Sequence, residues 1–139
     1  MTLIVDAGPI VAMHDRNDPR QAAAEALLRA EPGLLVIPAP VSAEIDHLLA
    51  RRLGEASRQA FLEDCAAGRY AVTCLTVDEY EVVLSLERRY AELAPGLADL
   101  SIAVLAHRHG TDRIATFDER DFRMIRPIGR RGAFTLLPD

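Results

Sequence analysis

The chain has 139 residues, 50% of them apolar, which is enough for one compact domain with a buried core. Its formal charge is −5 at pH 7, and all 16 basic residues are arginine because the sequence contains no lysine. The missing lysine excludes P-loop nucleotide binding, Schiff-base chemistry and phosphorelay receivers, which depend on a lysine side chain. Net acidity by itself also argues against a nucleic-acid partner.

Cysteine usage and the amino terminus indicate a cytoplasmic protein. Cys65 and Cys74 form neither a CxxC pair nor a disulfide framework. The segment Met1–Asp6 lacks the basic and long apolar regions of a signal peptide, and no segment reaches the roughly 20 apolar residues that cross a bilayer. No repeat or linker is visible, so we expect a single domain over residues 1–139.

Short apolar runs alternate with helical segments along the whole chain. Strands are predicted at Leu3–Val5, Leu34–Ile37, Tyr70–Leu75, Arg113–Thr116 and Ala133–Leu137. A first helix is predicted to start at Pro9. Further helices are predicted at Arg20–Ala30, Val41–Arg52, Ala56–Ala67, Thr76–Leu93 and Leu97–His109. Strands that are apolar throughout and alternate with helices are typical of a parallel sheet covered on both faces. The predicted fold is a three-layer α/β domain with a short parallel sheet of four to five strands.

Four acidic residues lie where ligand sites form in such sheets, beyond the carboxyl ends of the strands. Asp6 and Asp118 directly follow the first and fourth predicted strands. Glu44 lies at the edge of an apolar helix stripe, and Asp99 lies in the first turn of a helix that is apolar nearly all round. Each has an ordinary alternative: a helix cap for Asp6 and Asp99, an amphipathic boundary for Glu44, and a polar loop for Asp118.

Taken together, the four carboxylates indicate a metal site. Clustered carboxylates raise one another's pKa unless a cation lies between them. Oxygen ligands favour Mg²⁺ or Mn²⁺, and the four histidines match no zinc spacing. A metal held in this way activates water for phosphodiester hydrolysis. The sequence therefore predicts that the metal ligands are also the catalytic residues: Asp6, Glu44, Asp99 and Asp118.

Five segments together carry a resemblance to a known family: Leu3–Ala12, Val36–Glu44, Gly96–Ile102, Ile114–Phe122 and Arg126–Pro138. In this order they resemble the PIN-domain ribonucleases, and within them the VapC-type toxins of bacterial type II toxin–antitoxin pairs. The family's three invariant acids fall on Asp6, Glu44 and Asp99, and its more variable fourth falls on Asp118. Thr116 matches a small hydroxyl residue near the site. Asp121 is less consistently acidic among relatives and is a second accessory candidate.

The resemblance implies a PIN-like fold and Mg²⁺-dependent cleavage of RNA, often one tRNA or one ribosomal loop. It also implies a homodimer and inhibition by a small VapB-type antitoxin encoded alongside. The early helices, with apolar edges around Leu27, Leu28, Leu48 and Leu49, are the surface that we expect the antitoxin and the dimer mate to cover.

A net acidic nuclease must present arginines locally to hold RNA. Residues 113–131 contain six arginines and three acids, whereas the remaining residues contain ten arginines and 18 acids. The candidates for contacts to RNA phosphates beside the metal follow the fourth predicted ligand: Arg120, Arg123, Arg126, Arg130 and Arg131. With no tryptophan and few other aromatics, a structured RNA recognised by shape and backbone is favoured over base stacking.

Two other functions are alternatives to an RNA-cleaving toxin. A phosphatase of the haloacid-dehalogenase kind requires Asp-x-Asp after the first strand, but Gly8 stands at the second acidic position and the required lysine is missing. The other alternative is a PIN-like module that binds RNA or protein with weak or no catalysis. The presence of all four acids argues against it.

Overall fold

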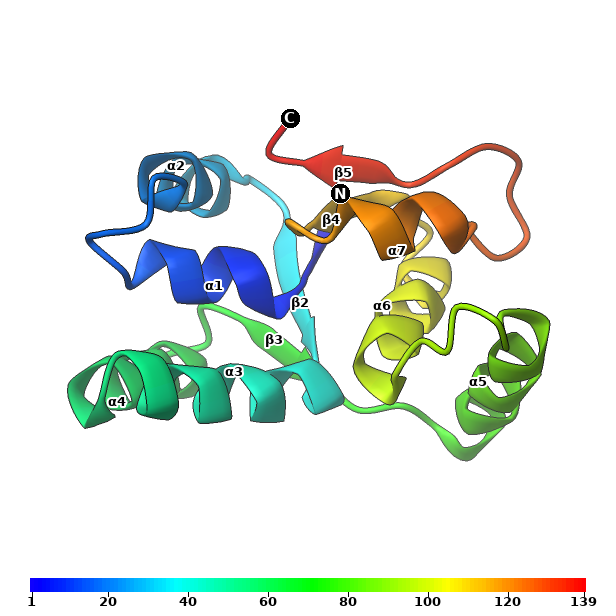
Figure 1. Ribbon diagram of the computed structural model, residues 1–139, viewed down its shortest axis with the longest axis horizontal. Helices are drawn as coiled ribbons and strands as arrows, with labels where there is room; N and C mark the ends of the chain where they lie inside the picture. The colour runs from blue at the N-terminus through cyan, green and yellow to red at the C-terminus, as the bar shows by residue number, and fades with distance from the viewer.

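The computed structural model describes residues 1–139 and contains one five-stranded sheet (Figure 1). Its strands are β1 Thr2–Val5, β2 Leu34–Pro38, β3 Ala71–Thr73, β4 Arg113–Ala115 and β5 Thr135–Leu137. All strand pairs are parallel, in the order β3-β2-β1-β4-β5. The carboxyl ends of the five strands therefore share one edge, which confirms the predicted parallel α/β architecture.

Seven helices connect the strands. They are α1 Ala7–Met13, α2 Gln21–Ala30, α3 Ala39–Arg52, α4 Glu55–Ala66, α5 Val77–Arg89, α6 Leu97–Arg108 and α7 Glu119–Met124. Figure 1 shows α1 to α4 on one side of the sheet and α5 to α7 on the other, which gives three layers. None of these helices is long and apolar enough to span a membrane.

The central strand β1 and helix α6 are the most completely buried elements of the fold. Leu3, Ile4 and Val5 of β1 are fully buried because helices cover both faces of the sheet. Helix α6 is buried at every position from Leu100 to Ala106, as its apolar sequence predicts. It packs on β1, β2 and β4, so its amino-terminal turn lies near the carboxyl ends of these strands.

Two helices differ from the prediction. The helix predicted to reach Leu93 ends at Arg89, and the chain turns before α6, with Ala94 at a positive φ of 50°. Helix α7 was not predicted, because its six residues, mostly charged, are too few to show helical periodicity. It is held to the core by Phe122, which is fully buried and packs edge-on against Phe134.

The apolar edges expected to face a partner are also largely internal. Leu28 and Leu49 are buried, and Leu27 and Leu48 pack against the core, because α1 lies against both α2 and α3. Leu28 and Leu49 therefore cannot belong to a partner surface, whereas Leu27 and Leu48 are partly exposed, and the placement of the partners on these helices stays a prediction. Several of the exposed large apolar side chains lie instead on α5: Val77, Tyr80, Val82 and Leu84.

Candidate metal centre

Asp6 connects β1 to α1 and is held by two hydrogen bonds. Its Oδ1 accepts from the backbone N–H of Ala7 at 2.8 Å, so Asp6 is the N-cap of α1. Its Oδ2 accepts from the hydroxyl of Thr116 at 2.7 Å. Burial raises the pKa of the Asp6 carboxyl, and these two hydrogen bonds oppose the rise. Asp6 is thus both a helix cap and a fixed carboxylate at the strand edge.

Thr116 joins two of the predicted acids. It is buried directly after β4, donates to Asp6, and accepts from the backbone N–H of Asp118 at 3.0 Å. One hydroxyl therefore positions the segments that follow β1 and β4 relative to each other. This contact gives the accessory candidate Thr116 a positioning role.

Asp99 lies in the first turn of α6, but it is not the cap of that helix. The N-cap position is occupied by Gly96, which provides no side-chain hydrogen bond. Burial, reinforced by the neighbouring carboxylates with Asp6 first, raises the pKa of Asp99 to about 7. Helix capping therefore does not explain why a carboxylate is placed here.

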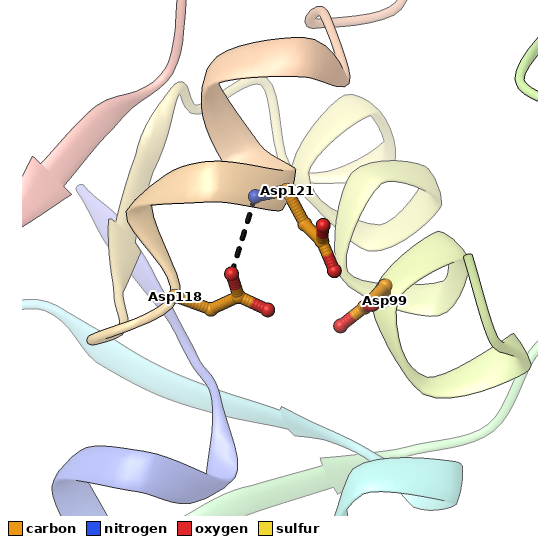
Figure 2. A group of neighbouring side chains, drawn as sticks. All are labelled: Asp99, Asp118 and Asp121. Carbon is orange, nitrogen blue, oxygen red and sulfur yellow. Dashed lines mark hydrogen bonds between the residues drawn. The ribbon is translucent and has the colours of Figure 1, made fainter. Parts of the chain in front are cut away.

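Asp118 and Asp121 approach Asp99 from α7. Asp118 caps this helix by accepting from the backbone N–H of Asp121 at 3.1 Å. Figure 2 shows the Asp121 side chain directed toward Asp99 from the first turn of α7. One carboxylate oxygen from each of Asp99, Asp118 and Asp121 lies within 4.8 Å of the other two. Asp121, only an accessory candidate in the sequence, thus belongs to the tightest group of acids in the fold.

Glu44 completes the acidic group from α3. A cavity of about 440 Å³ is lined by Asp6, Glu44, Asp99 and Asp118 together with Ala7, Gly8, Leu48 and Phe117. Glu44 is the most exposed of the four, yet burial within the cavity and the charge of Asp6 raise the pKa of its carboxyl. The structure therefore brings together all four acids predicted as metal ligands.

The donor set fits a hard divalent cation. None of Asp6, Glu44, Asp99, Asp118 and Asp121 takes part in an ion pair with arginine, and no basic residue lines the cavity. Carboxylate oxygens without histidine or cysteine are the ligands that suit Mg²⁺ or Mn²⁺. Burial and the neighbouring carboxylates together raise the pKa of Asp99, and a bound cation would oppose both effects.

The predicted arginines fall into two groups. Arg120 and Arg123 are exposed on α7, the helix that carries Asp121. Arg126, Arg130 and Arg131 line a different cavity, together with Arg89 of α5. The guanidinium of Arg130 donates to the carbonyl of Gly110, which follows the far end of α6 from Asp99. The structure thus does not bring these three arginines to the acidic cluster.

Comparison with known proteins agrees with the fold. The PIN domain model matches residues 3–126. Ribonuclease VapC26 of Mycobacterium tuberculosis is 33% identical over 136 residues, which cover 98% of this chain and 100% of that protein. The chain therefore belongs to the PIN-domain family, and within it to the VapC ribonucleases.

Solved structures share the fold at lower sequence identity. The crystal structure of VapC20 from Mycobacterium tuberculosis, a toxin that cleaves the sarcin–ricin loop, superposes with a TM-score of 0.77 and 22% identity over 85% of this chain and 91% of that one. VapBC2 from Rickettsia felis, bound to a DNA fragment from its promoter, superposes with a TM-score of 0.66 and 19% identity over 90% of this chain and 93% of that one. The predicted PIN-like fold is thereby confirmed.

Proposed function

We propose that this protein is a Mg²⁺-dependent endoribonuclease that acts as the toxin of a toxin–antitoxin pair and cleaves a structured RNA such as tRNA or ribosomal RNA. The observation that carries the proposal is the convergence of Asp6, Glu44, Asp99 and Asp118 on one cavity that contains no basic residue. The name of the relative VapC26 and the RNA-loop cleavage described for VapC20 support the choice of RNA as substrate.

Within this site the acids have different roles. Asp99, Asp118 and Asp121 would hold the ion, because their oxygens lie within 4.8 Å of one another. Mg²⁺, when bound, supplies an activated water and neutralises the charge that develops on the scissile phosphate. Asp6 stays in one orientation through Ala7 and Thr116, so it presents a fixed oxygen to the cavity.

Glu44 is suited to take the proton of the attacking water. Its carboxyl is the most exposed of the cavity acids, and its pKa is raised by burial and by Asp6. A raised pKa makes a carboxylate a better proton acceptor near neutral pH. Neither Cys65 nor Cys74 lines the cavity, so no thiol is placed to attack the phosphate.

The exposed arginines of α7, Arg120 and Arg123, are the side chains that we assign to phosphates beside the cut. They lie on the same short helix as Asp121, and neither forms an ion pair with a carboxylate. A guanidinium can bind phosphate oxygens in two-point contacts.

The partners that we propose are a second copy of this chain and a VapB-type antitoxin, in the cytoplasm. The support is family membership, together with the VapBC2 structure, in which a VapC-like chain is part of a complex. Light scattering of the purified protein, alone and after co-expression with a short reading frame next to its gene, tests both partners. A monomer that stays free in both preparations would contradict them.

The cleavage assay compares the wild-type protein with Asp99→Asn on total RNA, with Mg²⁺ or with EDTA. Asp99 is a cleaner target than Asp6, because Asp6 also caps α1. Asp112→Asn is the matched control, since Asp112 is a half-buried aspartate just before β4, at the opposite edge of the sheet.

We expect cleavage by the wild-type and control proteins in Mg²⁺ only, and none by Asp99→Asn. Cleavage that ignores EDTA, or that persists in a folded Asp99→Asn protein, would rule out the metal mechanism. RNA binding without any cleavage would favour the alternative of a catalytically inactive PIN-like module.

A further inference from the structure

A second cavity, of about 560 Å³, lies between α5 and the segment that follows α7. Four arginines line it: Arg89 from α5, and Arg126, Arg130 and Arg131 from the segment before β5. The remaining lining residues are apolar or glycine. We call this cavity with its four arginines the arginine pocket. It shares no residue with the acidic cavity.

The arginine pocket contains no counter-charge. Six of the twelve arginines outside the pocket form ion pairs with carboxylates: Arg20, Arg29, Arg58, Arg69, Arg108 and Arg113. None of the four arginines of the pocket forms such a pair, although the chain has 21 acids for 16 arginines. Four neighbouring cations without a carboxylate repel one another, and an anion from outside would relieve that repulsion.

Two of the guanidinium groups are held in place by the backbone. Arg126 Nη1 donates to the carbonyl of Gly132 at 3.2 Å, and Arg130 Nη2 donates to the carbonyl of Gly110. Each guanidinium has five N–H donors, so these contacts leave others free for a ligand. Cations that are already ordered lose less side-chain entropy when they bind an anion.

The segment that carries these arginines is also anchored to the helices beneath it. The backbone N–H of Arg126 donates to the hydroxyl of Tyr90 at 3.1 Å, and His107 Nδ1 lies 3.1 Å from the carbonyl oxygen of Ile128. The chain then turns at Gly132, whose φ of 96° is favourable only for glycine. The pocket is therefore a shaped feature of the fold with fixed walls on two sides.

We propose that the arginine pocket binds a phosphate group of the RNA backbone away from the cut. Planar guanidinium groups match the geometry of phosphate oxygens, and an unpaired cluster of them is an electrostatic binding site for a polyanion. The choice of RNA as the source of the phosphate rests on the proposed function. The pocket itself rests only on the four unpaired arginines.

The position of the pocket sets a minimum size for the substrate. Asp99 lies in the first turn of α6, and Arg130 binds the carbonyl of Gly110 just beyond its last turn. A helix of 12 residues is roughly 18 Å long. A phosphate at the Arg130 end would then lie about 15 Å from the metal site, or about four steps of roughly 3.4 Å along a nucleic-acid duplex. The substrate must extend at least this far from the cut.

The test measures RNA binding in the Asp99→Asn background, where cleavage does not interfere. The double variant Arg89→Ala/Arg131→Ala removes the two pocket arginines that make no hydrogen bond to the protein backbone, so it keeps the contacts of Arg126 and Arg130 with Gly132 and Gly110. Arg51→Ala/Arg52→Ala is the matched control, because these residues are adjacent, exposed and unpaired on α3, and the change in net charge is the same. Fluorescence anisotropy with labelled tRNA is recorded over a range of salt concentrations.

We expect the pocket variant to bind tRNA roughly tenfold more weakly, with the slope of log K against log salt reduced by about one per lost phosphate contact. The wild-type protein should also bind tRNA more tightly than an oligonucleotide of about four residues, and the pocket variant should lose this preference. Equal changes in the pocket and control variants would overturn the proposal, as would no change in either.

Competitors identify the source of the anion. Displacement of labelled tRNA from the wild-type protein by inorganic phosphate or AMP as effectively as by unlabelled tRNA would show a site for small anions and overturn the assignment to RNA. A loss of poly-glutamate binding in the pocket variant, without any change in tRNA binding, would point to an acidic protein segment and overturn it as well.

Failure of this inference is distinguishable from failure of the proposed function. If RNA is cleaved but the pocket and control variants bind it equally, the proposed nuclease activity stands and the proposed role of the arginine pocket is rejected. If RNA binding depends on the pocket but the wild-type protein does not cleave RNA, the proposed role of the pocket stands and the proposed nuclease activity is rejected.

Discussion

The two cavities of this protein have opposite charge and similar size. The acidic cavity, about 440 Å³, is lined by four carboxylates and no arginine, whereas the arginine pocket, about 560 Å³, is lined by four arginines and no carboxylate. Neither set takes part in the seven ion pairs that the chain forms elsewhere. The net charge of −5 therefore conceals two unpaired sets of opposite sign at separate places in the fold. These two sets are where we propose that ligands supply the missing charge.

The two sets differ in how the protein tolerates them. The carboxylates are partly buried, and burial together with their mutual repulsion raises the pKa of Asp99 to about 7. The arginines are exposed, and water screens the repulsion between them. Removing a charge should therefore alter both activity and stability in the acidic cavity, but mainly binding in the arginine pocket.

Besides Asp99→Asn, the largest effect is expected from Asp118 and Asp121, the N-cap and a first-turn residue of α7. Asp118→Asn and Asp121→Asn should each reduce cleavage by about 100-fold, because each removes a charged oxygen from the group that would hold the ion. Glu119→Gln, between them in the chain but exposed, is the control and should remain active. Rates are measured on one RNA at fixed Mg²⁺. Full activity of Asp121→Asn would exclude this residue from the site.

The next effect concerns stability without metal. Because the pKa of Asp99 is raised from 3.8 to about 7 in the folded state, its contribution to stability is present at low pH and lost as the pH rises toward 7. Asp99→Asn should therefore stabilise the metal-free protein at about pH 8 by on the order of 2 kcal/mol, and much less at about pH 4. Urea unfolding in EDTA measures this difference. A destabilised variant at the higher pH would contradict it.

A smaller effect is expected from the hydroxyl that joins Asp6 and Asp118. Thr116→Val keeps the shape of the side chain but loses both hydrogen bonds, so cleavage should fall about tenfold through misplaced carboxylates. Thr116→Ser keeps the hydroxyl and should recover most of the activity. Initial rates over a Mg²⁺ titration separate the two variants, and equal loss in both would show that only packing matters here.

The smallest effect should come from the exposed arginines of α7. Arg120→Ala and Arg123→Ala should each weaken RNA binding a few-fold and reduce the salt slope by about one, as expected for single phosphate contacts. Binding is measured by anisotropy beside Arg16→Ala, an exposed arginine between α1 and α2. If RNA affinity falls no more in these variants than in Arg16→Ala, Arg120 and Arg123 do not contact the RNA.

Local sequence patterns predicted the part of the site that depends on single elements. A short apolar strand followed by Asp6 and a buried helix that opens with Asp99 are each recognisable within about ten residues. A parallel sheet then brings these residues to one edge. Asp121 could be ranked only once α7 was known, since it reaches Asp99 through the turn that Asp118 caps.

The position of three arginines could not be predicted from the sequence. Arg126, Arg130 and Arg131 follow Asp118 closely in the chain, which suggested that they lie near the metal. Because β5 is parallel to β4, the chain must first return to the opposite edge of the sheet and carries them away. Their neighbour Arg89 comes from a distant segment and could be found only in the folded structure.

The central claim is that the acidic cavity binds a divalent cation, and calorimetric titration of Mn²⁺ into the metal-free protein tests it directly. We expect binding by the wild-type protein and by Asp112→Asn, accompanied near neutral pH by proton release because Asp99 must ionise. Asp99→Asn should bind at least about tenfold more weakly, without that proton release. Equal Mn²⁺ affinity and equal proton release in all three proteins would contradict a metal site in this cavity.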